Sequence, residues 1–311
     1  MLTVLKTALE VGLIYGLVAL ALFISFSILN IADLSTDGCF TLGCAVGAML
    51  TIAGHPLLAL PAAMAAGMLS GFITAFLQTR LGVESILAGI ISNTGLYTIN
   101  LAVMGFSSNV SITGRDTVFS LFKALTGGSQ WSTLVLLALL LGVIAVMLIR
   151  FFGTSLGLSI RATGDSLDMV SASSINPKAT ITIGLCLANA LTALSGCLIG
   201  EYNKFCDINL GTGMVTIALA SLIIGEVFAG RRGGVGKRVV CVVLGSIVYR
   251  LIIALALRLN ISAEYFKLVS AVIVAVAIAA PNMKDYVHLA KIRSNARKLR
   301  ALSGKGDATD A

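Results

Sequence analysis

The stretch Val11-Gly-Leu-Ile-Tyr-Gly-Leu-Val-Ala-Leu-Ala-Leu-Phe-Ile-Ser-Phe-Ser-Ile-Leu29 decides the fold class, because it carries no charged residue along its whole length. An α-helix rises about 1.5 Å per residue, so about 20 apolar residues cross a hydrocarbon core of about 30 Å. Lys6 precedes the stretch, as in a signal peptide, but the apolar run is too long for a signal core and no small-residue cleavage site follows it. We therefore expect a first transmembrane helix here.

The composition of the rest of the chain extends this expectation to a polytopic membrane protein. Of the 311 residues, 57% are hydrophobic and 12% are charged, whereas soluble domains carry about 25% charged residues. Helices satisfy their backbone hydrogen bonds internally in lipid, so we expect an all-α transmembrane helical bundle that forms one domain over residues 1–283. Gly54, His55 and Pro56 separate the second and third spans, which form either a tight hairpin or one broken element. We predict about nine spans, within a range of about 8–10, at residues 8–29, 38–54, 57–78, 85–106, 131–152, 178–200, 214–230, 239–259 and 268–283.

Basic residues in short loops predict the orientation, because they favour the cytoplasmic side. In a nine-span chain three basic segments lie on one side of the membrane, so we expect that side, which includes the C-terminus, to be cytoplasmic. The side of the N-terminus then depends on the number of spans: an odd number places it outside and an even number places it inside. The net charge of +8 is explained by contact with anionic lipid, without nucleic acid. The tail of residues 284–311 is either an amphipathic helix on the membrane surface or a solvated segment. The three basic segments contain Arg150 and Arg161; Arg231, Arg232, Lys237 and Arg238; and Lys284, Lys291, Arg293, Arg297, Lys298 and Arg300.

The sequence does not match the known motifs for catalysis, metal binding or nucleotide binding. The glycine-rich stretch from Gly230 to Arg238 lacks both the first Gly and the Ser or Thr that the phosphate-binding loop requires. The six cysteines lack metal-ligand spacing and are interpreted as small core residues, and the two histidines lie far apart. We therefore expect neither an enzyme nor a metal or cofactor site.

Polar residues within or beside the spans are costly in lipid and are candidates for a solute pathway. Arg250 and Glu226 could form an intramembrane ion pair, or each could extend separately to its own partner. Between the first two spans, Ser35, Thr36 or Asp37 could cap the following helix, while Asp33 and Asp37 could instead line a wet cavity. The candidate pathway residues are Asp33, Asp37, Asn93, Asn189, Glu226 and Arg250.

Four pairs of glycines stand four residues apart within apolar segments, which allows close contact between helix backbones. We interpret them as packing positions within the bundle, with a dedicated dimer contact as the alternative. The pairs are Gly12 and Gly16, Gly43 and Gly47, Gly67 and Gly71, and Gly196 and Gly200.

The loop of residues 153–177 differs from the others in its length and pattern, Gly157-Leu-Ser-Ile-Arg-Ala-Thr-Gly-Asp-Ser-Leu-Asp-Met-Val-Ser-Ala-Ser-Ser-Ile-Asn-Pro177. We expect Gly164 to break the chain, Asp165 to cap a short helix and Pro177 to end it. A short cytoplasmic helix with exposed apolar side chains would be a docking element for another protein.

This loop pattern, Arg-Ala-x-Gly-Asp followed by Met and by Ile-Asn, resembles the coupling loop of permeases in the branched-chain amino acid and ribose class of ABC importers. Three further stretches agree, namely Gly12 to Gly43, Ala193 to Gly213, and Ile224 to Gly236, so the resemblance covers most of the chain. Ser174 is a departure, because the family often has Gly before the Ile-Asn pair. The loop residues that the resemblance assigns to the contact with the ATPase are Arg161, Ala162, Gly164, Asp165 and Met169.

The resemblance implies a multi-pass permease subunit in the bacterial plasma (inner) membrane that forms the path for a small solute. A separate cytoplasmic ATPase would bind ATP, an extracytoplasmic binding protein would deliver the solute, and the permease would act as a homodimer or with a sister permease. The stretch from Asp33 to Gly43 is similar to a subgroup associated with tryptophan or tyrosine binding proteins, which implies an aromatic amino acid. Branched-chain amino acids, sugars and nucleosides stay open, as do an ion-driven secondary transporter and a membrane scaffold.

Overall fold

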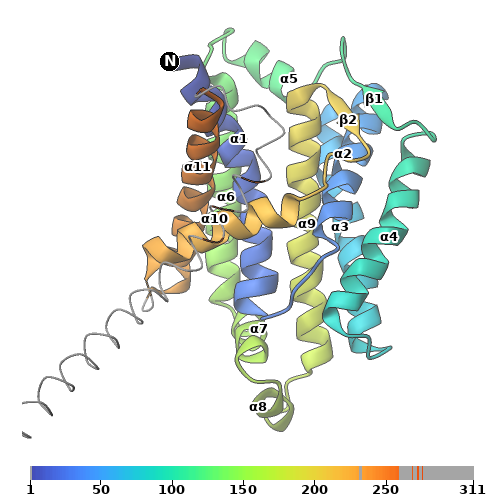
Figure 1. Cartoon of the computed structure of the whole chain (residues 1–311), viewed down its shortest axis with the longest axis vertical. Coiled ribbons are helices and arrows are strands. Elements are labelled where there is room, and N and C mark those ends of the chain that lie inside the picture. Colours follow the sequence, from blue (N-terminus) through green and yellow to red (C-terminus); the bar gives the residue numbers. More distant parts are fainter. Residues whose placement is uncertain (1, 231–232, 259–267, 269–271, 273–274, 276–311) are drawn as a thin grey trace, which may run out of the picture.

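The computed structural model describes residues 2–230 and 233–258, together with residues 268, 272 and 275. In this part of the chain the protein is a bundle of helices (Figure 1). Two short antiparallel strands, β1 (Asn109–Ser111) and β2 (Phe205–Asp207), pair at one end of the bundle, with Val110 opposite Cys206. The expected all-α fold of a polytopic membrane protein is confirmed.

Among the described residues, six helices are long and apolar enough to cross a membrane, and two shorter apolar helices accompany them. These eight helices coincide with the first eight predicted spans, but the first begins at Leu2 rather than at residue 8. The predicted span 268–283 falls almost wholly outside the described residues, as does the tail, so the count of nine stays a prediction. The long helices are α1 (Leu2–Leu22), which continues as the π-helical η1 (Phe23–Ile28), α3 (Pro56–Thr79), α4 (Ser85–Val103), α6 (Ser132–Phe152), α9 (Pro177–Asn203) and α11 (Val235–Arg258), and the shorter ones are α2 (Thr36–Ile52) and α10 (Met214–Ala229).

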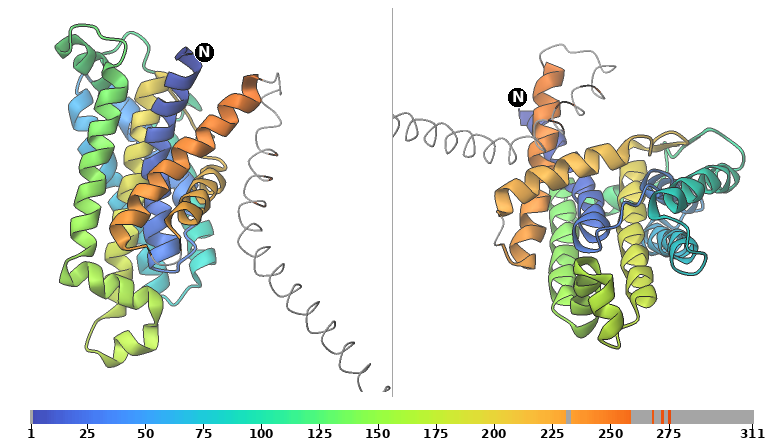
Figure 2. Two further views of the ribbon diagram at one scale, coloured as in Figure 1. Left: turned by 90° about the vertical axis from the view of Figure 1, so that its left-hand side faces the viewer. Right: turned by 60° about the horizontal axis from the view of Figure 1, so that its bottom comes forward.

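The helices pack in two groups that meet along α1 and α9 (Figure 2). Helix α9 packs against α2 and α3, whereas α1 packs against α10 and α11. Within the membrane-crossing part, 83% of α9 is buried by other helices but only 22% of α6. The apolar outer surface of α6 is therefore available to lipid, while α9 forms the centre of the protein.

Small residues bring the helices of the central group into direct backbone contact. A Cβ atom added to Gly43 would lie 1.9 Å from the carbonyl oxygen of Ala193, and one added to Gly196 would lie 1.9 Å from that of Phe40. Gly67 lies similarly close to the backbone of Asn189. All four predicted glycine pairs face helices of the same chain, which agrees with their interpretation as packing positions within the bundle.

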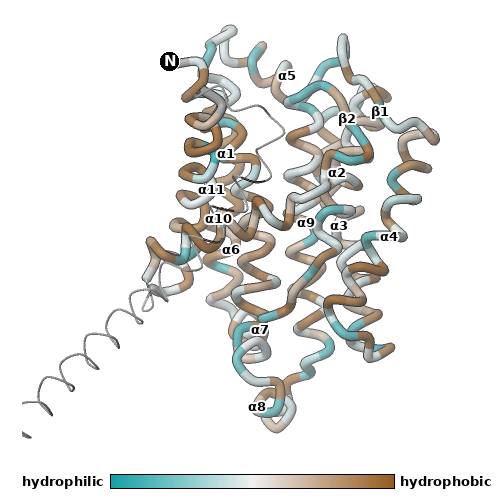
Figure 3. Tube along the Cα trace, in the orientation of Figure 1, coloured by the Kyte–Doolittle hydropathy of each residue, from teal (hydrophilic) through white to brown (hydrophobic). Residues whose placement is uncertain are grey.

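The two ends of the bundle differ in their elements and in the positions of their charges. One end, here called the strand end, carries β1, β2 and the short helix α5 (Val118–Leu125), and the N-terminal end of α1 lies there (Figure 1). The opposite end, here called the basic end, carries α7 (Ser155–Asp165) and α8 (Leu167–Ala172) with Arg150, Arg161 and Arg238. Hydrophilic segments concentrate toward these ends, whereas apolar residues predominate along the long helices between them (Figure 3).

Candidate functional site

The two short helices α2 and α10 both begin inside the bundle rather than at one of its ends (Figure 1). Asp37, in the first turn of α2, joins them, because its Oδ2 accepts a hydrogen bond from Gly213 N at 2.9 Å and its Oδ1 accepts one from Val215 N at 2.9 Å. Thr41 Oγ1 accepts a further bond from Gly211 N at 3.1 Å. A carboxylate is favourable at the positive N-terminus of a helix, so Asp37 holds the start of α10 against α2.

This arrangement corrects the expectation that Ser35, Thr36 or Asp37 caps the helix that follows them in sequence. Ser35 is the N-cap residue of α2, but no side-chain capping bond is present there. Asp37 instead caps α10, which lies far away in the sequence. Capping preferences are local statistics, and here a helix from another part of the chain presents its free N–H groups to the same carboxylate.

A polar cavity of about 420 Å³ lies beside this junction, between α2, α4 and the link from β2 to α10. Of the predicted pathway residues, Asp37 and Asn93 line it. Asn100 Nδ2 donates to the carbonyl of Gly38 at 3.0 Å, while its buried Oδ1 accepts no hydrogen bond from any described residue. The cavity thus combines a carboxylate, amides and hydroxyls in an otherwise apolar bundle. Its lining consists of Asp37, Gly38, Thr41, Asn93, Thr94, Tyr97, Thr98, Asn100, Ile208, Asn209 and Thr212.

The sequence analysis did not predict most of the lining residues as site residues, although the spacing of polar residues in α4 could have indicated some of them. Asn93, Tyr97 and Asn100 recur at intervals of three or four residues, so they share one face of an α-helix. Polar residues of this kind on one face of an apolar helix indicate a wet surface. Asn209 and Thr212 had no such signal, because they lie in an irregular link whose position depends on α10.

Asp33 and Asn189 lie together but do not line this cavity. Asn189 Nδ2 donates to Asp33 Oδ2 at 2.8 Å, and both side chains are buried. Asp33 Oδ1 also accepts from the backbone N–H of Ser35 at 2.9 Å. Buried polar groups need such partners, so this pair fastens the irregular link before α2 onto α9.

Of the two alternatives for Glu226 and Arg250, the ion pair between them is wrong and separate partners are found, because Glu226 binds Arg238. The Arg238 Nη2 and Glu226 Oε1 atoms are 2.7 Å apart, and Ser27 bonds to both side chains. Glu226 lies near the end of α10 and Arg238 near the start of α11, so the turn between the helices brings them together. Arg250 is about 18 Å farther along α11, at about 1.5 Å per residue.

Arg250 lies over the ring of Tyr15, with its Cζ 3.9 Å from the ring centroid. Its buried Nε donates to no acceptor among the described residues, and none of the described carboxylates forms an ion pair with it. Of the six predicted pathway residues, the structure therefore brings Asp37 and Asn93 to one cavity and Asp33 and Asn189 to one buried contact. Glu226 and Arg250 occupy separate places.

The predicted coupling loop forms α7 and α8 at the basic end, but its local structure corrects three expectations. Helix α7 continues through Gly164 to Asp165, and Ser166 rather than Asp165 caps α8 by accepting from Met169 N. Gly164 serves close packing, because an added Cβ would lie 1.8 Å from the carbonyl oxygen of Ile28. Pro177 begins α9 instead of ending the preceding helix, and prolines are favourable in a first turn.

Ser174 adopts a φ of 58°, a conformation that glycine favours and that few other residues adopt. This is the position at which the sequence departs from the Gly often found in the family that it resembles. The turn before α9 thus keeps a left-handed backbone although a serine occupies it.

Three of the five predicted coupling residues are exposed on this pair of helices. Arg161 and Asp165 stand four residues apart on α7, and Met169 on α8 is 72% exposed. Ala162 and Gly164 are half-buried, and Gly164 packs against the backbone of Ile28. Leu167, 53% exposed, adds to the apolar surface beside Met169.

Comparison with known proteins gives the family of the chain. The profile of the family described as "Branched-chain amino acid transport system / permease component" matches residues 4–278. A tyrosine transport system permease protein of Clostridioides difficile (strain R20291) is 31% identical over 273 residues, which cover 88% of this chain and 89% of that protein. An uncharacterized protein of Rickettsia prowazekii (strain Madrid E) is 31% identical over 285 residues, 91% of this chain and 99% of that protein. No solved structure matches the chain. The chain therefore belongs to the family of permease components of branched-chain amino acid transport systems.

Proposed function

We propose that this permease is the membrane subunit of an ATP-driven importer for an amino acid, with α7 and α8 as the docking site of a cytoplasmic ATPase. The observation that carries the proposal is the exposed apolar pair Leu167 and Met169 beside the charged residues Arg161 and Asp165. An apolar centre with charges around it is the usual composition of a protein interface. The basic end would then be the cytoplasmic face, in agreement with the preference of basic residues for that side.

The contacts of α7 support a mechanical role for this docking site. Gly164 packs directly on the carbonyl of Ile28 in η1, the segment that leads into the link toward α2. Thr163 also bonds to Thr180 of α9 at 2.8 Å. A displacement of α7 by the ATPase would therefore reach both the link before α2 and the central helix α9.

The solute that we propose is an aromatic amino acid, such as tyrosine, delivered by an extracytoplasmic binding protein at the strand end. The tyrosine transport function of the relative from C. difficile supports this class. The cavity beside Asp37 would form a wet part of the path, and a second copy or a sister permease would complete it. Discontinuous helices are a recurring feature of membrane transport sites.

An ion-driven transporter that works without an ATPase is the alternative. It would need acidic groups free to bind a coupling ion within the bundle. Glu226 is paired with Arg238, and Asp33 and Asp37 accept hydrogen bonds from Asn189 and from the start of α10. These engagements favour the ATP-driven mechanism.

Uptake of labelled L-tyrosine into proteoliposomes tests the proposal, with the permease reconstituted beside the ATPase and binding protein encoded by neighbouring genes. Uptake should require ATP and persist with an ionophore. Arg161→Glu or Asp165→Arg should reduce uptake at least about tenfold while ATP hydrolysis continues, because the docking contact is lost. Arg80→Glu, the same charge reversal at an exposed position in the link between α3 and α4, is the matched control and should leave uptake unchanged.

Two results would contradict the proposal. Uptake that persists without ATP and collapses with an ionophore would favour the ion-driven alternative. Full uptake by both coupling-loop variants would show that α7 and α8 do not transmit the energy of ATP hydrolysis. Direct measurement of solutes bound by the binding protein would identify the substrate independently of both results.

A further inference from the structure

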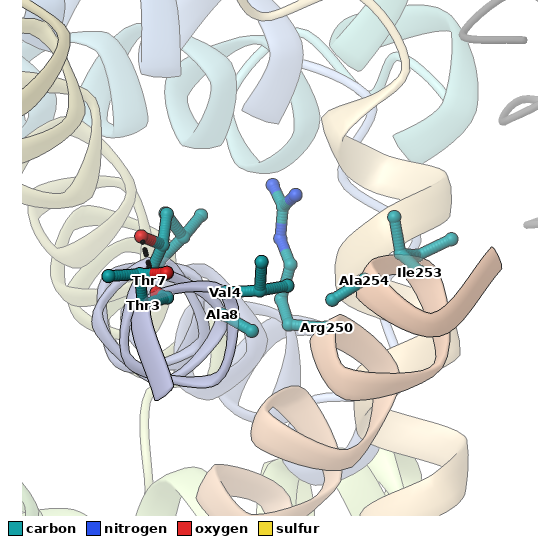
Figure 4. A pocket seen from close by; sticks show the side chains of 8 residues that line it. Thr3, Val4, Thr7, Ala8, Arg250, Ile253 and Ala254 are labelled. Carbon is teal, nitrogen blue, oxygen red and sulfur yellow. Dashed lines mark hydrogen bonds between the residues drawn. The ribbon is translucent and has the colours of Figure 1, made fainter. Parts of the chain in front are cut away.

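Helices α1 and α11 enclose a groove of about 280 Å³ that opens near the N-terminal part of α1. Apolar and hydroxyl side chains line it, and Arg250 is the only charged residue among its described lining residues. Figure 4 shows the Arg250 guanidinium standing between the α1 residues Thr3 and Thr7 on one side and Ile253 on the other. The volume is close to the lower limit of about 300 Å³ for small-molecule sites, which suits a ligand of the size of a single amino acid.

The described elements packed around Arg250 do not supply it with a counter-ion. Helix α11 contains no acidic residue, and the only acidic residue of α1 is Glu10. Glu10 forms no ion pair with Arg250 among the described residues: its Oε1 lies 3.6 Å from Lys6 Nζ without accepting a hydrogen bond, and its Oε2 accepts one from Tyr202 at 2.9 Å. Among the described residues, the guanidinium of Arg250 lies over the face of Tyr15, which attracts the cation, and its buried Nε donates no hydrogen bond.

A cation in this position is costly for the folded protein. Charged residues inside transmembrane segments are rare, and those that occur face cavities or pathways and serve function. A guanidinium held by an aromatic ring presents its fork of N–H donors in a fixed plane, and this fork matches the two oxygens of a carboxylate. The groove therefore offers an anion site with a defined geometry, at the side of the bundle remote from α7 and α8.

We propose that Arg250 binds the carboxylate of the transported amino acid in the groove between α1 and α11. This inference rests on the proposed function, since it assigns a group of the solute to a residue of the path. It also narrows the substrate class, because sugars and nucleosides lack the carboxylate that the guanidinium recognises.

Cysteine labelling of the purified permease, without ATPase or binding protein, tests this assignment. Val4 lines the groove and is 49% exposed, whereas the neighbouring Leu5 is 48% exposed and lies outside it. Val4→Cys and Leu5→Cys therefore form a matched pair for reaction with N-ethylmaleimide. The six native cysteines are unpaired and five of them are buried, so the wild-type protein gives the background.

L-Tyrosine, L-tryptophan or L-leucine should slow the labelling of Val4→Cys, and none should affect Leu5→Cys. The decarboxylated amines tyramine, tryptamine and isoamylamine should give no protection. Arg250→Gln should raise the concentration of amino acid needed for half protection by about 10- to 100-fold, as expected for the loss of charge-assisted hydrogen bonds. Arg250→Lys keeps the charge without the fork and should have a smaller effect.

Three outcomes would overturn the proposal: equal protection by amines and amino acids, equal protection of Arg250→Gln and wild-type protein, or no protection by any of the amino acids. Protection by anionic phospholipid vesicles alone would assign the groove to a lipid phosphate instead. Gel filtration and thermal unfolding establish that each variant is folded. Because the labelling needs no ATP, its failure is distinguishable from failure of the ATP-dependent uptake test.

Discussion

Replacement of Asp37 tests whether its contact between the short helices α2 and α10 holds α10 in place. Its carboxylate accepts hydrogen bonds from Gly213 N and Val215 N, each at 2.9 Å. Each charge-assisted bond contributes about 1.5–3 kcal/mol, and the lower value applies because the side chain is half-buried. Asp37→Ala should therefore reduce the free energy of unfolding by about 3 kcal/mol. Asp37→Asn keeps one acceptor oxygen and should lose about half of that.

Thermal unfolding of the detergent-purified permease measures this loss. At about 2–4 °C per kcal/mol, Asp37→Ala should lower the unfolding temperature by about 6–12 °C and Asp37→Asn by about 3–6 °C. Asp116→Ala, at an exposed position, is the control and should change the temperature by less than about 2 °C. Hydrogen exchange at the amide of Val215 should also accelerate in Asp37→Ala, because its acceptor is gone.

The reasoning is refuted if Asp37→Ala unfolds at the same temperature as Asp116→Ala. A second possible result concerns the role of Asp37 in transport. If Asp37→Asn keeps the wild-type stability and yet loses uptake, the carboxylate acts on the solute in the cavity rather than as a helix cap.

Three further predictions follow from the packing and the polar contacts. Gly43→Ala should destabilise the protein by about 1–3 kcal/mol in thermal unfolding, because its Cβ would meet the Ala193 carbonyl, whereas Gly142→Ala, which has open space, should not. A double-mutant cycle of Glu226→Ala and Arg238→Ala should give a coupling energy of about 0.5–1 kcal/mol, since both side chains are about one-third exposed; additivity would disprove the pair. Glu201→Ala should raise hydrogen exchange at the start of α5, because Glu201 accepts from Val118 N at 2.8 Å; unchanged exchange would show that the contact does not hold α5.

The sequence predicted the location of the helices well, because length and hydropathy are properties of each segment alone. The expected spans 57–78 and 131–152 correspond to Pro56–Thr79 and Ser132–Phe152. The loop between α6 and α9 was also distinguishable, since its pattern of Gly, Asp, Met and Pro differs from that of every apolar span. Glycine spacing likewise predicted close helix contacts, although it did not name the helices that meet.

The partners of charged and polar groups could not be predicted in the same way, because each partner comes from a distant part of the chain. The positions of Glu226 and Arg250 within predicted spans and their opposite charges suggested that they pair, but the turn between α10 and α11 places Arg238 beside Glu226. Local capping preferences assigned Asp37 to α2, but its carboxylate accepts hydrogen bonds from N–H groups at the start of α10.

Hydropathy and periodicity in the sequence by themselves determined that this chain is a helical membrane protein and where its helices run, because lipid selects each apolar segment separately. Only the tertiary structure decided which polar residues share a cavity and that Arg250 has no ion-pair partner among the described residues, because these depend on how α10 and α11 fold back across the bundle.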